Sequence, residues 1–106
     1  MADITELEIE SFEKAINYSY AEGKLSPYAE STISKINEMV CKTYNLKFGT
    51  ETNKRIKSTV LETMIANWKG FYNVKKPIYD FFLDYCKMLY NGECYKMKKQ
   101  NAATAV

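Results

Sequence analysis

The sequence predicts an all-α fold, a compact single domain arranged as a four-helix array. Along four segments, apolar residues recur at spacings of three and four, which places their side chains on one face of a helix. Residues that start or end helices bound these segments, and the glycines fall at such boundaries, at Gly23, Gly49, Gly70 and Gly92. No segment shows the sustained alternation of apolar and polar residues that indicates a strand. With 106 residues, of which 46% are apolar, the chain is long enough to bury one core.

The first helix is expected over about residues 5–22. Thr5 and Glu8 form a capping-box pattern at its start, and Gly23 is typical of a helix C-cap. Ser26 followed by Pro27 is a strong start signal for a second helix, over about residues 26–45. Because the link between the two is short, we expect them to form an antiparallel hairpin.

The third helix is expected over about residues 51–69, with Thr50 or Thr52 as its cap and Gly70 at its end. The fourth is expected over about residues 77–91, opened by Pro77 and closed by Asn91-Gly92. Residues 93–106 are expected to form a basic segment and then a loose tail.

The fourth helix is apolar around most of its circumference, which is typical of a central helix or of one at an interface. Its main buried face is predicted to consist of five residues, namely Ile78, Phe81, Phe82, Tyr85 and Leu89. Tyr79, Cys86 and Tyr90 are among the residues that widen this face.

The chain contains no histidine, which excludes histidine-based catalytic triads and the usual zinc sites. Its three cysteines, Cys41, Cys86 and Cys94, lie in separate predicted elements without CxxC spacing, and no phosphate-binding glycine loop is present. We therefore expect no enzyme activity, no cofactor and no metal site. Reduced cysteines favour a cytoplasmic location, and no apolar run approaches the length of a membrane span.

Charge is distributed unevenly along the chain. Residues 1–22 carry six acids and one lysine, a net charge of −5, whereas the rest of the chain carries +7. The basic residues are 14 lysines and a single arginine, Arg55. Many lysine, asparagine, isoleucine and tyrosine residues indicate AT-rich codons, which suit a phage, a mobile element or a low-GC bacterium.

Aromatic residues are concentrated between Trp68 and Tyr95, with lysines among them. Tyrosine is favoured at protein interfaces because it joins a broad apolar ring to a polar tip. The predicted partner surface consists of Tyr72, Lys75, Lys76, Tyr90, Tyr95 and Lys96.

The leading hypothesis is a small non-catalytic binding protein that acts through a protein interface, in its specific form a phage or mobile-element inhibitor or modulator of a host protein. Self-association into an oligomer fits as well, because the acidic first helix complements the basic remainder. A nucleic-acid-binding regulator is the alternative, using the lysine clusters formed by Lys54, Arg55, Lys57, Lys98 and Lys99. The third hypothesis is a small nucleotide-type ligand that is bound between helices by tyrosine and lysine side chains. One arginine is few for reading DNA bases, which places the protein interface first.

Overall fold

The computed structural model describes residues 4–71 and 76–104 of the chain and confirms the all-α four-helix fold. Its helices are α1 (Glu6–Glu22), α2 (Pro27–Tyr44), α3 (Thr50–Ala66) and α4 (Ile78–Thr104), with a short 3₁₀ helix, η1 (Trp68–Phe71), after α3. Within these described ranges there is no strand, and none of the helices is long and apolar enough to cross a membrane.

Both ends of α1 follow the predicted capping chemistry. The backbone N–H of Glu8 donates to the Thr5 hydroxyl oxygen at 3.1 Å, and the Thr5 N–H donates to the Glu8 carboxylate at 3.3 Å. Together these two bonds complete a capping box. At the other end, Gly23 adopts a left-handed φ of 74°, which a residue with a side chain adopts only with strain.

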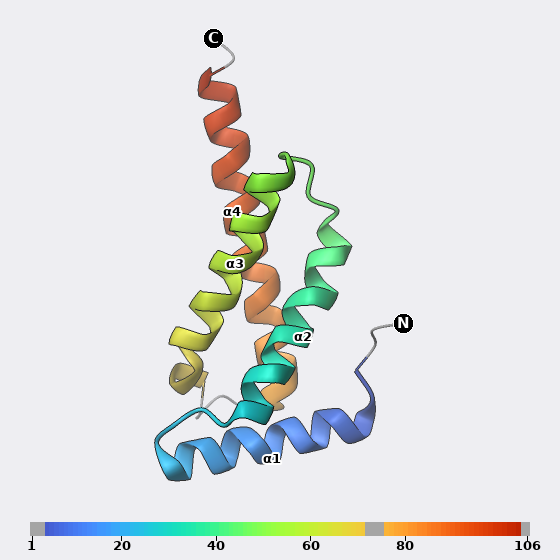
Figure 1. Ribbon diagram of the computed structural model, residues 1–106, viewed down its shortest axis with the longest axis vertical. Coiled ribbons are helices and arrows are strands. Elements are labelled where there is room, and N and C mark those ends of the chain that lie inside the picture. The colour runs from blue at the N-terminus through green and yellow to red at the C-terminus, as the bar shows by residue number, and fades with distance from the viewer. Residues whose placement is uncertain (1–3, 72–75, 105–106) are drawn as a thin grey trace.

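The start of α2 is also as predicted, with the Ser26 side chain accepting from the Ala29 N–H at 3.2 Å. The predicted antiparallel hairpin is wrong, because α1 lies crosswise beneath the other helices (Figure 1). The corner is fixed by Ser19, whose hydroxyl accepts from the Ser26 N–H at 2.9 Å and donates to the Ala15 carbonyl at 2.7 Å. In this orientation α1 contacts both α2 and α4.

The core lies where the four helices meet, and both α2 and α4 pack against all three of the other helices. The Phe12 ring of α1 meets the Phe82 ring of α4 edge to face, with centroids 5.3 Å apart. The largest fully buried apolar side chains come from all four helices: Phe12, Ile16, Ile33, Ile36, Val40, Val60, Met64, Phe82 and Tyr90. Trp68 of η1 closes the core beside them.

The buried stripe of α4 differs from the prediction. Its inward side chains are Tyr79, Phe82, Cys86 and Tyr90, which recur at helical spacing, and each is at most 8% exposed. Of the predicted face only Phe82 is fully buried, and the other four residues are half-buried. A helix with apolar residues on all sides does not itself specify which stripe faces inward, so the neighbouring helices decide.

The predicted end of α4 at Asn91-Gly92 is wrong, because the helix continues through Gly92 to Thr104. A glycine inside a helix costs about 1 kcal/mol relative to alanine. Burial beyond Gly92 offsets this cost, since Cys94 is half-buried and Met97 packs against the core. The extension carries α4 past the α2–α3 connection (Figure 1), and the molecule measures 52 × 29 × 23 Å.

Candidate functional site

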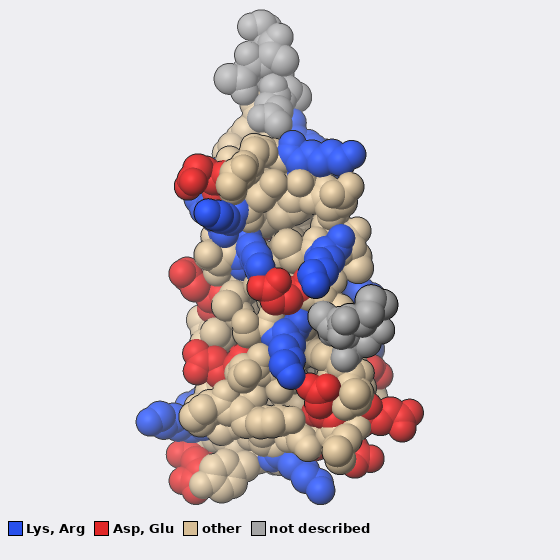
Figure 2. All heavy atoms as spheres, turned by 45° about the vertical axis from the view of Figure 1, so that its right-hand side comes forward, with Lys and Arg blue, Asp and Glu red and all other residues tan. Residues whose placement is uncertain are grey.

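One end of the molecule is strongly basic. It consists of the last turns of α2, the α2–α3 connection, the first half of α3 and the second half of α4, which lie together at one end of the long axis (Figure 1). These parts, residues 38–58 and 87–100, hold nine lysine or arginine residues and three glutamates, a net charge of +6. Figure 2 shows lysine and arginine prominent on the upper part of one face, whereas acidic residues are spread over its height and are more frequent in the lower half, where basic side chains also lie. We call this region the basic end.

A groove of about 640 Å³ opens at the basic end, between the α2–α3 connection and α4. One wall carries Leu46, Lys47 and Phe48 from the connection, and the other carries Cys94, Tyr95 and Lys98 from the α4 extension. Tyr44, Asn45 and Asn91 complete the lining. The groove therefore exists only because α4 continues beyond Gly92.

The connection that forms one wall is held in place by Asn53 of α3. Its side chain accepts from the Phe48 N–H at 3.2 Å and donates to the Leu46 carbonyl at 3.1 Å. Asn45 (φ 46°) ends α2 and Gly49 (φ 99°) precedes α3, both with positive φ. The predicted caps Thr50 and Thr52 are wrong, because Gly49 occupies the N-cap position without a side-chain hydrogen bond. Asn53 instead reaches back across the helix start.

Tyr44 forms part of the groove and ties α2 to α4. Its hydroxyl lies 3.0 Å from the Lys87 carbonyl and 2.8 Å from the Asn91 side-chain oxygen. Its ring stacks on that of Tyr90, with centroids 5.4 Å apart and planes inclined by 24°. Burial raises the pKa of Tyr44 above its ordinary value, so the phenol stays neutral and acts as a hydrogen-bond donor.

Tyr90 lies beneath Tyr44 and is fully buried, so its prediction as a partner-surface residue is wrong. Its hydroxyl donates to the side-chain oxygen of Asn37, and the Asn37 amide donates to the Lys57 carbonyl at 3.2 Å. Helical spacing from Phe82 and Cys86 turns the ring inward, and the buried Asn37 provides the partner that its hydroxyl requires. The residue supports the groove from below.

The rest of the predicted partner surface does not form one patch. Tyr95 is 68% exposed and lines the groove, and Lys96 beside it pairs with Glu93 at 3.2 Å. Lys76 pairs with Asp84 at 2.5 Å near the start of α4, which at 1.5 Å per residue lies about 30 Å from Lys96 along the helix. Tyr72 and Lys75 lie outside the described residues.

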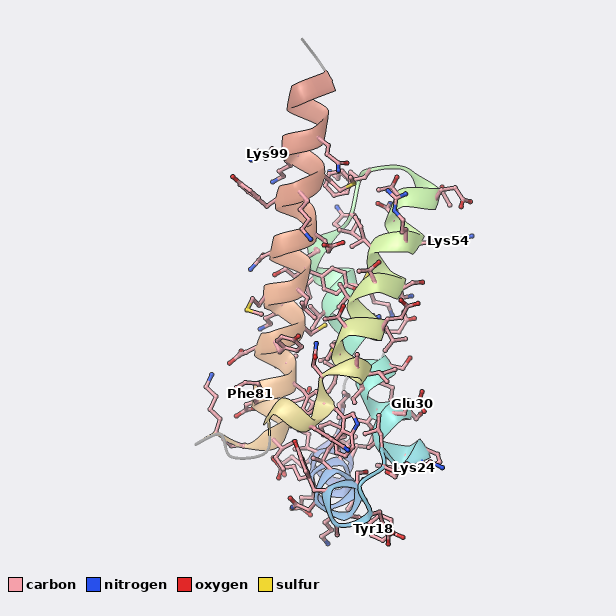
Figure 3. All side chains as sticks on the ribbon, turned by 90° about the vertical axis from the view of Figure 1, so that its left-hand side faces the viewer. Tyr18, Lys24, Glu30, Lys54, Phe81 and Lys99 are labelled. Atoms are coloured by element: carbon pink, nitrogen blue, oxygen red, sulfur yellow. The ribbon has the colours of Figure 1, made fainter. Side chains whose placement is uncertain are left out.

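The residues predicted as an alternative nucleic-acid-binding set do come together at the basic end. Lys54 and Lys99 lie toward the same end of the long axis in Figure 3, opposite Tyr18 and Lys24. Lys98 lines the groove, and Arg55 is exposed on α3. Lys57 forms an ion pair with Glu38 of α2 and is only partly available.

Most of the groove residues are missing from the predicted site residues, namely Tyr44, Asn45, Leu46, Lys47, Phe48, Asn91 and Cys94. The signal for two of them, Leu46 and Phe48, was their position in a short connection, because two large apolar residues in a loop need a surface to pack against. That surface is the α4 extension, which the sequence pattern did not predict.

Neither Cys86 nor Cys94 is an activated thiol. Burial raises the pKa of Cys86 to about 12, and burial also raises the pKa of Cys94 despite the nearby Lys98. A raised pKa leaves little nucleophilic thiolate near neutral pH. Among the residues that the structure describes, no three acidic, cysteine or histidine side chains group as metal ligands would.

Comparison of the chain with protein-family models, curated proteins and solved structures gave no match. What can be said of its function therefore depends on the groove and its charges.

Proposed function

We propose that the protein is a non-catalytic binding protein whose groove captures an acidic segment of a partner protein. The observation that carries this proposal is the position of Tyr95. Its ring is 68% exposed and lies beside Lys98 in a groove at an end of net charge +6. The amino-acid composition, which indicates a phage or mobile-element origin, favours blocking an acidic surface of a host protein as the form of this activity.

An exposed tyrosine beside lysines suits a protein partner for two physical reasons. Large aromatic side chains supply much of the binding energy at interfaces when they become desolvated. Surrounding lysines favour acidic partners and disfavour basic ones. The apolar Leu46 and Phe48 extend the contact along the wall, and Asn53 holds that wall in place before a partner arrives. Preorganisation of this kind reduces the entropy lost on binding.

Nucleic acid is the competing ligand for the basic end. Two of its lysines, Lys57 and Lys96, are already paired with glutamates. Arg55 is the single arginine of the chain, whereas arginine is the residue best suited to bidentate contacts with phosphates and bases. The apolar side chains of the groove wall, Leu46 and Phe48, offer nothing to a phosphate backbone. These observations favour the acidic protein segment.

The test is affinity purification from cells of the source organism, with nuclease treatment. The baits are the wild-type protein, the Tyr95→Ala and Lys98→Glu variants, and Tyr28→Ala as a matched control. Tyr28 is also an exposed tyrosine, 47% accessible, but it lies at the start of α2, away from the basic end. We expect one protein to be retained by the wild type and by Tyr28→Ala, and to be lost from the two groove variants.

The same four proteins are then titrated with single-stranded and duplex oligonucleotides, followed by fluorescence anisotropy. Phosphate-driven binding weakens steeply with salt, so we expect it to be nearly gone at about 0.2 M salt. Oligonucleotide binding that persists at this salt and is abolished by Lys54→Glu with Arg55→Glu would overturn the proposal in favour of a nucleic-acid-binding protein.

A further inference from the structure

The end of the molecule opposite the groove has the reverse charge. Residues 4–37, 59–71 and 76–86 hold nine acids and five lysines, a net charge of −4. Helix α1 lies across this end (Figure 1) and presents Glu6 and Glu10 to solvent. Two large apolar side chains are exposed on the same helix, Leu7 at 72% and Tyr18 at 61%.

These features make α1 a candidate for the kind of segment that the groove is proposed to bind. It is a preformed helix with a largely acidic surface. Its exposed residues Leu7, Lys14 and Tyr18 lie at helical spacing, with the half-buried Ser11 between the first two. A helix with exposed apolar anchors is a common occupant of apolar grooves, where the anchors insert and the charges fix its orientation.

The α1 helix cannot occupy the groove of its own chain. The two lie toward opposite ends of a molecule 52 Å long, and the packing of Phe12 and Ile16 into the core holds α1 in place. The charge complementarity between α1 and the basic end can therefore be satisfied only between two copies.

We propose that the groove at the basic end binds α1 of a second copy of this chain, so that the protein self-associates head to tail. This inference rests on the proposed function, because it uses the same groove and names one acidic occupant for it. Because the two surfaces differ, every dimer still has one groove and one α1 unoccupied. Association therefore continues into chains or closes into a ring. Because the attraction is largely electrostatic and at the surface, it weakens as salt is added.

The test uses the full-length protein and two charge-reversal variants in analytical ultracentrifugation, from micromolar to millimolar concentration. One variant, Glu6→Lys with Glu10→Lys, changes α1 and leaves the groove intact. The other, Lys47→Glu with Lys98→Glu, changes the groove and leaves α1 intact. We expect the average mass of the wild type to rise with concentration at about 0.01 M salt and to return toward the monomer at about 0.15 M. Each variant alone should remain monomeric.

Mixing the two variants gives the decisive measurement. The intact α1 of one fits the intact groove of the other, and the reversed charges on the two remaining surfaces are also complementary. An equimolar mixture should therefore regain the association that neither variant shows alone. Circular dichroism checks that both variants keep their helices. Glu30→Lys with Glu62→Lys reverses two exposed acids outside α1 and should associate as the wild type does.

A wild type that stays monomeric at millimolar concentration and low salt would overturn the inference, as would a mixture that stays monomeric. Association of either the α1 variant or the groove variant on its own would also overturn it. The outcome is separate from that of the proposed function, because the variant changed in α1 keeps its groove. If that variant still retains the partner protein while the wild type does not self-associate, only the self-association is wrong.

Discussion

The ring of Tyr44 stacks on the ring of Tyr90 with centroids 5.4 Å apart, which joins the exposed groove to the buried core. Tyr44 lines the groove and Tyr90 is fully enclosed, so a side chain at the site rests directly on one that stabilises the fold. Changes in the core beneath the groove are therefore expected to affect binding as well as stability.

Removing the Tyr90 hydroxyl is expected to destabilise the protein. The change Tyr90→Phe leaves the Asn37 side-chain oxygen without its partner in a buried site, which costs about 1–3 kcal/mol. Urea denaturation followed by circular dichroism measures the free energy of unfolding. Tyr95→Phe is the control and should leave it unchanged, because Tyr95 is exposed. Equal stability of the two variants would contradict this account of the Tyr90–Asn37 contact.

Truncating the core aromatic of α4 is expected to have a larger effect. Phe82 is fully buried against Phe12, and Phe82→Ala leaves a cavity that costs about 3–5 kcal/mol. Met88 on the same helix is 56% exposed, so Met88→Ala should cost less than about 1 kcal/mol. Thermal and urea denaturation of both variants test the order. The reverse order would mean that α4 presents a different face to the core.

Two glycines are expected to respond to alanine in opposite ways. Gly92 lies inside α4, and a Cβ there would meet no atom within 4 Å, so Gly92→Ala should stabilise the protein by about 1 kcal/mol. Gly23 has equally open space but a φ of 74°, so Gly23→Ala should destabilise it by straining the backbone. The free energy of unfolding of each variant gives the sign. Destabilisation by Gly92→Ala would show that α4 ends near this residue after all.

Stability is expected to fall in alkaline solution through Cys86. Burial raises the pKa of its thiol from 9.0 to about 12, so the folded chain holds this proton more tightly than the unfolded chain does. The contribution is fully present below pH 9 and is lost as the pH rises toward 12. Denaturation midpoints measured across this range should decline less steeply in Cys86→Ala than in the wild type. Parallel curves would mean that the thiol is not buried in solution.

The helix starts and several helix ends could be predicted from sequence because short-range chemistry determines them. The Thr5–Glu8 capping box, the left-handed Gly23 and the Ser26-Pro27 start each depend on residues within one turn of the boundary. Asn91-Gly92 is the same kind of local signal and was wrong, since partners distant in sequence hold the next turns in a helix. Met97 gains burial that a local pattern does not reveal.

The candidate site was harder to predict for the same reason. Tyr95 was predicted as a partner-surface residue and Lys98 as a nucleic-acid-binding one. Their companions Lys47 and Phe48 come from a connection some 50 residues earlier. Tyr90 was assigned to the partner surface because it falls at the predicted end of its helix, whereas α4 continues to Thr104. The side-chain oxygen of the buried Asn37 accepts a hydrogen bond from the Tyr90 hydroxyl, which explains why this tyrosine can lie in the core.

The charges at the two ends also bear on how quickly a partner is found. With +6 near one end and −4 over the rest of the described chain, the protein has a permanent electric dipole moment along its 52 Å axis. In the electric field of an acidic surface, such a molecule rotates before contact, so that the groove faces the surface when the two meet. Fewer collisions are then wasted in unproductive orientations, and the association rate constant should exceed that of a variant with the same net charge spread evenly. The excess of lysine over arginine does not matter for this effect, because rotation in a field depends on where charge lies and not on which group carries it.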